Sequence, residues 1–499
     1  MSETTRILLG YILSFAYMIF VMLVGEVLSR KLGVEREISR KISHLLSSAC
    51  WIICYFFSGP TYHTVIINAA ALMLVAAGEF SGKLKSAVRE GDGGEERKSS
   101  KGFGMSFFCF STLVAMCITV FAYPQLFATT GVAYYSLALG DGLAPIGKRI
   151  AGKYNIKVFG NKTLVGMIMV FVVSSLVAMT ISLIFGLGYD ALFIISLGAL
   201  AAVAELIGTR GTDNILVEFF VFAYAAMFAF GVVPQALEVA IIIAAPMFVV
   251  DSVKQTLTPA ANIISYLYLL VSVFCLGYVF LVTAVCLFAA EAVISRVTGK
   301  IFNSKNEDGD AEKSTRGGWQ ILVNSVVIML FTLLLRVLDV RALAFVAFAV
   351  LVEEFTDSVA SDVGRLAKKP PIDILRFRRV KAGVSGGVSL LGSCAAVICA
   401  AVGAALPFVF FAFDIRAYFV ILGCAVLGMV IDSVLGSSIQ ALYKCSVCGK
   451  TTERSEHCGT GAELVKGVRI VNNSMVNLLS AVTTAAIAVT ILMCCGIAM

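Results

Sequence analysis

Long runs of apolar residues separated by short polar segments form the pattern of this chain from end to end. A helix that crosses a bilayer needs about 20 apolar residues, so we interpret each run as a transmembrane helix. The pattern therefore predicts an all-α, polytopic membrane protein with about 14 transmembrane helices. In the first half the runs are 8–28, 45–57, 65–80, 106–121, 132–139, 165–185, 191–207 and 217–233. In the second half they are 263–290, 321–338, 342–353, 388–411, 418–442 and 475–497.

The polar segments alternate between charged and nearly uncharged. Lys and Arg concentrate on the cytoplasmic side of membrane proteins, so we predict that the charged segments all face the cytoplasm and that the N-terminus lies outside. The same alternation predicts that part of 235–262 does not span. We expect an integral membrane protein, in the plasma membrane if the chain is prokaryotic. The charged segments are 30–44, 81–104, 140–162, 208–218, 291–319, 356–385 and 443–473.

Composition agrees with this pattern. Of 499 residues, 59% are hydrophobic and 14% are charged, against about 25% charged in soluble domains. The net charge of +7 comes from the polar segments, so we predict membrane lipids as the environment and no nucleic-acid partner. Most of the 14 cysteines lie singly in apolar runs, and no disulfide framework is expected. We divide the chain into modules 1–234 and 235–499.

The most polar stretch of the first module is 139–166, where Asp141 stands between two glycines and a Lys162-Thr163 pair follows. Glycines let backbone N–H groups approach an anion, cations neutralise phosphate, and an isolated Asp suits Mg²⁺. We interpret this stretch as a loop that grips a nucleotide triphosphate. An ordinary basic cytoplasmic loop is the alternative, and it leaves Asp141 and the glycine spacing unexplained. The cations are Lys148, Arg149, Lys153, Lys157 and Lys162.

Other ionisable residues fall on the same predicted face. Such groups at membrane depth are candidates for function, although snorkelling anchors or helix-end residues are the alternative for each one alone. Carboxylates, an amide and several cations together are the groups of a Mg²⁺-nucleotide site. They are Arg40, Lys41, His44, Glu79, Glu205, Asp213 and Asn214.

Five stretches carry a family resemblance: RKISH (40–44), KGFGM (101–105), LGDGLAPIGKRIAGK (139–153), GNKTLVG (160–166) and AELIGTRGTDN (204–214). They resemble the polyprenol kinases, which include dolichol, phytol and CTP-dependent diacylglycerol kinases and are related to the phosphatidate cytidylyltransferases. The resemblance covers about residues 8–233 and implies phosphorylation of a membrane lipid alcohol, typically from CTP. It implies that Asp141 holds Mg²⁺ and that Lys162 binds phosphates, with Glu205, Asp213 and Asn214 completing the site. The Lys-Asp and His-Gly-Gly elements of the cytidylyltransferases are absent, which argues against nucleotidyl transfer.

The second module repeats these residue types. Glu353, Glu354, Asp357 and Asp362 lie at the end of an apolar run, and like charges this close call for a cation such as Mg²⁺, which we assign to Asp357. A carboxylate within a span, as at Asp432, usually faces a site. Candidate phosphate-binding residues here are Arg379, Lys381, Gly386 and Asn473.

The stretches FTDSVASDVG (355–364), KAGVSGGVSLLG (381–392), IDSVLGSSIQ (431–440) and NNSMVNLLS (472–480) resemble a second membrane family. It includes transmembrane protein 19 and the plant phytyl-phosphate kinase. The resemblance covers about residues 263–499, and it implies phosphorylation of a prenyl monophosphate to the diphosphate.

A compact set of metal-ligand residues lies in the last charged segment, within 443–470. Cys445-x2-Cys448 is followed by His457-Cys458, and thiolates with imidazole at such spacing favour structural Zn²⁺. A reduced pair of cysteines with an incidental His-Cys is the alternative.

Together the two modules predict a lipid kinase that works in two steps. The first site would convert a prenyl alcohol such as phytol, farnesol or geranylgeraniol to its monophosphate, and the second would add another phosphate. The expected cofactors are Mg²⁺, CTP as donor and Zn²⁺. Three alternatives stay open: a diacylglycerol or dolichol kinase with a non-catalytic second half, a phosphatidate cytidylyltransferase-like enzyme, and a lipid-phosphate transporter.

Overall fold

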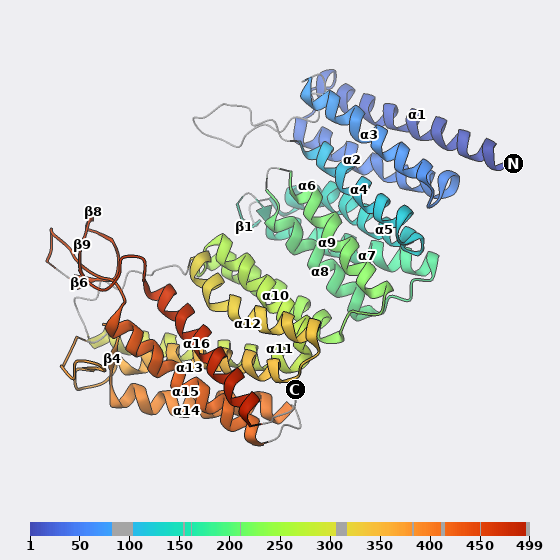
Figure 1. Ribbon diagram of the computed structural model, residues 1–499. Coiled ribbons are helices and arrows are strands. Elements are labelled where there is room, and N and C mark those ends of the chain that lie inside the picture. The colour runs from blue at the N-terminus through green and yellow to red at the C-terminus, as the bar shows by residue number, and fades with distance from the viewer. Residues whose placement is uncertain are drawn as a thin grey trace. The chain divides into compact units, whose positions relative to one another are not determined.

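The computed structural model divides the chain into two compact units, Met1–Lys254 and Gln255–Met499 (Figure 1). Each unit is a bundle of helices with a few short strands. The structure describes residues 1–81, 103–152, 155–160, 162–209, 211–305, 317–381, 384–410, 415–449 and 451–495. Most of the predicted segment 81–104, with Lys101 and Gly102 of its KGFGM stretch, lies outside these residues, as does Lys153.

In the residues that the structure describes, the first unit contains ten α-helices and one hairpin, in the order given at the end of this paragraph. Apolar runs long enough to span become single helices, while most of the polar stretch 140–162 forms a short helix and a hairpin. The helices are α1 (Glu3–Arg30), α2 (Arg36–Ile53), α3 (Tyr62–Phe80), α4 (Gly104–Phe121), α5 (Phe127–Tyr135), α6 (Gly142–Ala151), α7 (Leu164–Phe185), α8 (Ala191–Ile207), α9 (Asp213–Ala229) and α10 (Gln235–Lys254). Between them lie η1 (Cys54–Ser58), η3 (Pro124–Leu126), η4 (Ser136–Asp141), β1 (Lys157–Phe159) and β2 (Lys162–Thr163).

Helix α8 lies at the centre of this unit, in contact with α7, α9 and α10. Its alanine-rich run from Ala199 to Ala204 is almost fully buried, and small residues let membrane helices approach closely. Gly198 shows how close: a Cβ there would lie 2.1 Å from Ser175 Oγ of α7. The Asp190 side chain begins α8 by accepting a hydrogen bond from Phe193 N at 2.8 Å, as an N-cap does.

The described residues of the second unit form six α-helices and small antiparallel sheets at its polar segments. The helices are α11 (Pro259–Lys305), α12 (Gly318–Leu338), α13 (Ala342–Gly364), α14 (Leu390–Phe410), α15 (Ile415–Ser438) and α16 (Asn473–Cys494). The strands are β3 (Ile372–Asp373), β4 (Gly387–Val388), β5 (Leu442–Lys444), β6 (Thr451–Thr452), β7 (Glu456–His457), β8 (Thr460–Gly461) and β9 (Glu463–Lys466). Strands β3 and β4 pair, β5 pairs with both β6 and β9, and β7 pairs with β8.

Helix α13 is the central helix of the second unit, packed against α11, α12, α14, α15 and α16. Nearly every residue from Ala342 to Val352 is buried, because the helix is apolar on all sides. Helix α11 is broken at Gly277, whose backbone (φ 67°, ψ −151°) is not helical. Such a conformation is open to glycine and costly for other residues.

The predicted all-α membrane fold is confirmed. Among the described residues, ten helices are long and apolar enough to cross a membrane, and α8 is a shorter apolar helix. The count of about 14 stays a prediction. Helix α10 is itself one of the ten, where the sequence led us to expect a segment that does not span. It packs against α8 and β1, so the division between the units falls after Lys254 rather than after residue 234.

The interpretation of 139–166 as a glycine-rich loop was wrong over most of its length. Residues Gly142–Ala151 form α6, and β1 and β2 form a hairpin after it. The helix glycines allow close packing of side chains: a Cβ on Gly142 would lie 2.8 Å from Leu45 of α2, and one on Gly147 would lie 2.4 Å from Met169 of α7. These glycines bring α6 against its neighbours, whereas the interpretation from sequence assigned them to the binding of phosphate.

Candidate functional site

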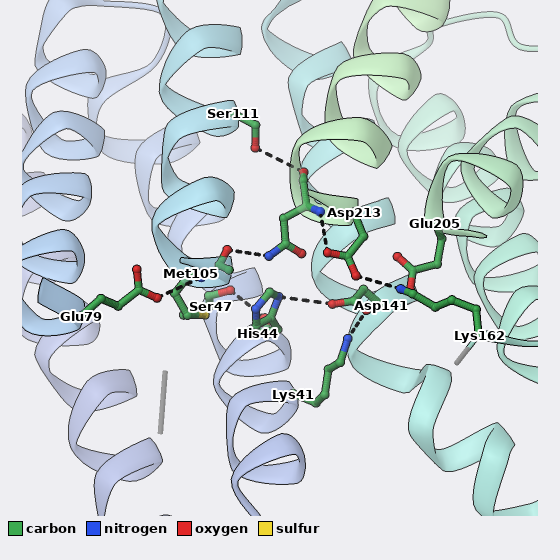
Figure 2. Close-up of polar contacts among 12 residues, drawn as sticks. Lys41, His44, Ser47, Glu79, Met105, Ser111, Asp141, Lys162, Glu205 and Asp213 are labelled. Atoms are coloured by element: carbon green, nitrogen blue, oxygen red, sulfur yellow. Dashed lines mark hydrogen bonds and ion pairs between the residues drawn. The ribbon is translucent and has the colours of Figure 1, made fainter. Parts of the chain in front are cut away.

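Asp141 is the centre of the polar cluster in the first unit. It ends η4, where α5 passes into α6, and 1% of its surface is exposed. Lys41 of α2 donates a hydrogen bond to its Oδ1, and His44 Nδ1 lies 3.8 Å from its Oδ2. Lys41 and His44 are neighbours on α2 because residues three apart share a helix face. Figure 2 shows both side chains directed at Asp141.

Lys162 joins two further carboxylates to the cluster. It lies on β2, and its Nζ forms ion pairs with Glu205 Oε1 at the end of α8 and with Asp213 Oδ2, 2.8 Å away, at the start of α9 (Figure 2). Burial by itself lowers the pKa of Lys162, but the carboxylates of Glu205, Asp213 and Asp141 raise it well above the usual value. The surrounding carboxylates therefore favour the charged form of Lys162.

Three carboxylates converge in this site. Asp141, Glu205 and Asp213 are buried, and each offers an oxygen within 4.8 Å of the others. Three of the predicted catalytic residues thus come from three separate helix ends and meet at one point. Among the described residues, Lys41 and Lys162 are cations that form ion pairs with them.

Glycines position the turn between α8 and α9 that carries Asp213 and Asn214. A Cβ on Gly208 would lie 2.3 Å from Asp213 Cα. Gly211 (φ +93°) approaches α4, and a Cβ there would lie 3.0 Å from Gly104 Cα. Asn214 Nδ2 then donates to the Gly104 carbonyl at 2.5 Å. The turn is tight because only glycine fits these positions.

Two buried glutamates hold the surrounding helices. Glu79 of α3 accepts hydrogen bonds from Met105 N (3.2 Å) and from Ser106 N (3.3 Å) at the start of α4, where unpaired N–H groups favour an anion. Glu218 accepts from Thr112 Oγ1 at 2.9 Å and from Ser111 Oγ. Glu218 was not among the residues predicted from the sequence, although it lies four residues after Asn214 and so on the same face of α9.

The site retains polar atoms that the described residues leave without a hydrogen-bond partner. Asp141 Oδ2, Glu205 Oε2 and Asn214 Oδ1 are buried and unbonded among them. Buried oxygens without a partner are costly, and carboxylate and amide oxygens are the ligands that Mg²⁺ takes. Both ring nitrogens of His44 are also unbonded there. The donor set therefore fits a hard divalent cation.

The remaining predicted residues of the first unit take other places. Thr163 is the N-cap of α7, with its Oγ1 accepting from Gly166 N at 3.4 Å. Arg40 is buried, and a Cβ on Gly104 would lie 3.3 Å from its Nη1. Lys148 lies in α6, one turn or more beyond Asp141.

The predicted acids of the second unit lie on helices, as their apolar runs led us to expect. Asp357 and Asp362 lie on α13 and Asp432 on α15. Asp362 pairs with Arg365 one turn later. The described residues contain two groups of three or more ligand-type residues within 4.8 Å, and these three acids belong to neither.

Glu353 is buried between helices of the second unit. Ser480 Oγ of α16 donates to its Oε1 at 2.7 Å. Gly428 of α15 makes room for it, since a Cβ there would lie 2.4 Å from Glu353 Cγ. Three helices thus meet at this carboxylate.

A polar turn lies at the end of α15. Asp373 of β3 is buried and accepts from Ser437 Oγ at 2.6 Å and from Arg376 N at 2.9 Å. Burial by itself raises the pKa of Asp373, but these hydrogen bonds lower it below the usual value. Gly386 (φ +82°) packs against Ser437, the residue that donates to Asp373. A Cβ on Gly386 would lie 2.5 Å from Ser437. The sequence analysis named Gly386 for phosphate binding and missed Asp373.

The other predicted phosphate-binding residues of the second unit lie apart from this turn. Arg379 and Lys381 are exposed. Asn473 is the exposed first residue of α16, while Asn472 before it is the N-cap and accepts from Met475 N at 3.0 Å.

The cysteine-histidine set comes together as a cluster. Cys445, Cys448, His457 and Cys458 offer ligand atoms within 4.8 Å of one another. His457 Nδ1 lies 3.4 Å from Cys448 Sγ and 3.2 Å from Cys458 Sγ. The three thiols are free.

One family profile matches the chain mainly over its second unit. The profile of the integral membrane protein family DUF92 matches residues 242–485. A curated relative, Protein PGR of Arabidopsis thaliana, is 33% identical over 140 residues, which are 26% of this chain and 47% of the relative. The match thus spans about half the length of that relative. No solved structure matches the chain.

Proposed function

We propose that this membrane protein is a Mg²⁺-dependent phosphotransferase that transfers the terminal phosphate of CTP to a prenyl alcohol. The observation that carries the proposal is the buried cluster of Asp141, Glu205 and Asp213 beside Lys41 and Lys162. Phosphoryl transfer depends on positioning and on neutralising charge, and this cluster offers oxygen ligands for a metal with cations next to them.

The cluster supports a division of roles. Asp141, Glu205, Asp213 and Asn214 would hold Mg²⁺, which neutralises phosphate charge when bound. Lys41 and Lys162 now neutralise the carboxylates, and in the complex they would bind phosphate oxygens instead. We place the site at the cytoplasmic face, where nucleotides are found. The resemblance of 8–233 to the polyprenol kinases supports the choice of CTP and of a lipid alcohol.

We assign the second step, from prenyl monophosphate to diphosphate, to the second unit. Support comes from its resemblance to the phytyl-phosphate kinase family and from the acids Glu353, Asp357 and Asp432 on neighbouring helices.

The test is an incubation of the purified full-length protein with Mg²⁺, γ-labelled CTP or ATP, and phytol or geranylgeraniol, with products separated by charge. We expect labelled monophosphate and diphosphate. Asp141→Asn should abolish the monophosphate, and Asp432→Asn should leave it and remove the diphosphate. Asp339→Asn is the matched control, because Asp339 is the left-handed C-cap of α12 and Asn accepts that conformation.

Other outcomes contradict the proposal in different ways. Label on diacylglycerol and on no prenol would make the protein a diacylglycerol kinase. Labelled monophosphate without diphosphate would contradict the second step that we assign to the second unit. If neither the wild-type chain nor Asp339→Asn labelled any lipid, the result would favour transport of a lipid phosphate.

A further inference from the structure

The hairpin segment 442–466 is a polar part of the second unit that contains none of the residues assigned to phosphoryl transfer. Strands β5, β6 and β9 form one small sheet, and β7 and β8 form a second hairpin beyond it. Cys445 follows β5 directly, and His457 ends β7. The two halves of the cysteine-histidine cluster are therefore carried by two separate turns of backbone.

The backbone is shaped to bring neighbouring side chains to one point. His457 and Cys458 are adjacent, and adjacent side chains of an extended chain point to opposite sides. Cys458 has φ +53°, a conformation that is costly for a residue other than glycine. It places Cys458 Sγ 3.2 Å from His457 Nδ1. Gly449 (φ +70°) likewise turns the chain after Cys448, and its N–H bonds to Cys445 O at 2.9 Å.

The four ligand atoms fit one metal in type and in spacing. A tetrahedral Zn²⁺ with bonds of about 2.3 Å to sulfur and about 2.0 Å to nitrogen keeps its ligands roughly 3.5–3.8 Å apart. Here the Sγ–Nδ1 distances are 3.2 Å and 3.4 Å, and all four atoms lie within 4.8 Å. Three thiols and one imidazole leave no open position.

The hairpin also contacts the polar turn at the end of α15. Glu453, just after β6, accepts a hydrogen bond from Ser385 Oγ, and Ser385 precedes Gly386, which packs against Ser437. On the other side of the hairpin, Lys466 Nζ donates to Gly436 O at 3.3 Å. The folded hairpin therefore fixes residues of the turn that surrounds Asp373.

We propose that segment 442–466 binds one structural Zn²⁺ through Cys445, Cys448, His457 Nδ1 and Cys458, and that the folded hairpin holds the Gly386 turn through Glu453. A small segment with so little apolar core needs a metal to fold. The ion is thus a structural support for the second unit, with no part in phosphoryl transfer.

The zinc content of the purified full-length protein tests the metal. We expect about one Zn²⁺ per chain, reduced at least about tenfold in Cys448→Ser and in His457→Ala. Cys394→Ser is the matched control, because Cys394 is an exposed free cysteine on α14 outside the hairpin, and it should keep full zinc. Protein without zinc, with iron in its place, or with equal zinc in all variants would overturn the proposal.

Tryptic cleavage after Arg379 and Lys381 tests the link to the turn. We expect a chelator to speed this cleavage several-fold in the wild-type chain. Glu453→Ala should speed it to a similar degree while zinc content stays at one ion, which separates the link from the metal. Cleavage unchanged in Glu453→Ala, or unchanged by removal of zinc, would overturn the link.

Discussion

Lys162 shows at the level of single residues how this site balances charge. Its ammonium lies between Glu205 and Asp213, and those carboxylates raise its pKa. A buried carboxylate pair without a cation is unfavourable, so Lys162 both stabilises the apo site and, in our proposal, binds the phosphates.

We expect Lys162→Met to lower kcat/KM for CTP by roughly 100-fold or more, because removal of one such contact in a buried site costs that much. Initial rates at varied CTP measure it. Lys157→Met is the control, since Lys157 is exposed on the paired strand β1. Equal activity of the two variants would show that Lys162 does not bind the phosphates of CTP.

The residue types of the site could be predicted from the sequence, but their pairing could not. Asp141, Glu205, Asp213 and Lys162 stand out as polar groups beside apolar runs. Lys41 and Asp141 are 100 positions apart, and only packing of α2 against η4 decides that they meet. Glu218 and Asp373 escaped notice because each looks like an ordinary polar residue until its partners are known.

At the level of elements, helices that span the bilayer follow from composition, while polar connections do not. Helix α8 has the bounds that its apolar run predicts, Ala191–Ile207. Helix α6 was not predicted, because its glycines indicate a loop by propensity. Close packing against Leu45 and Met169 outweighs that preference in the folded chain. The same contacts show why tertiary packing outweighs propensity in short polar helices.

The turn between α8 and α9 gives a prediction at this level. In Gly208→Ala the new Cβ would meet Asp213 Cα at 2.3 Å, so the carboxylate must shift. We expect activity to fall by about 100-fold, as small displacements of catalytic groups do, together with a lower melting temperature. Gly423→Ala on α15 is the control, because nothing lies within 4 Å of its Cβ position. Full activity of Gly208→Ala would show that the site tolerates the shift.

At the level of the whole molecule, the chain contains two separate units that each carry their own acids. In our proposal they act in sequence on one amphiphilic substrate. A fused pair of sites raises the effective concentration of the intermediate, so little monophosphate should be released by the wild-type chain.

A mixture of two inactive variants tests whether the two sites of one chain act in sequence. Neither Asp141→Asn nor Asp432→Asn should form diphosphate from prenol alone, but the two mixed in shared micelles should form it. We expect the mixture to accumulate several times more free monophosphate than the wild-type chain, because the intermediate must diffuse. A mixture that makes no diphosphate would show that one chain needs both acids for a single step.

The break at Gly277 also has a consequence for length. A straight helix of the 47 residues of α11 would measure about 70 Å, more than twice the roughly 30 Å of a hydrocarbon core. The part after the break alone would measure about 42 Å, so its last turns reach beyond the acyl chains. There it exposes Val293 and Val297 together with Arg296 and Lys300. This mixture of valines and cations suits the headgroup layer, where apolar side chains insert toward the acyl chains and cations bind anionic lipids.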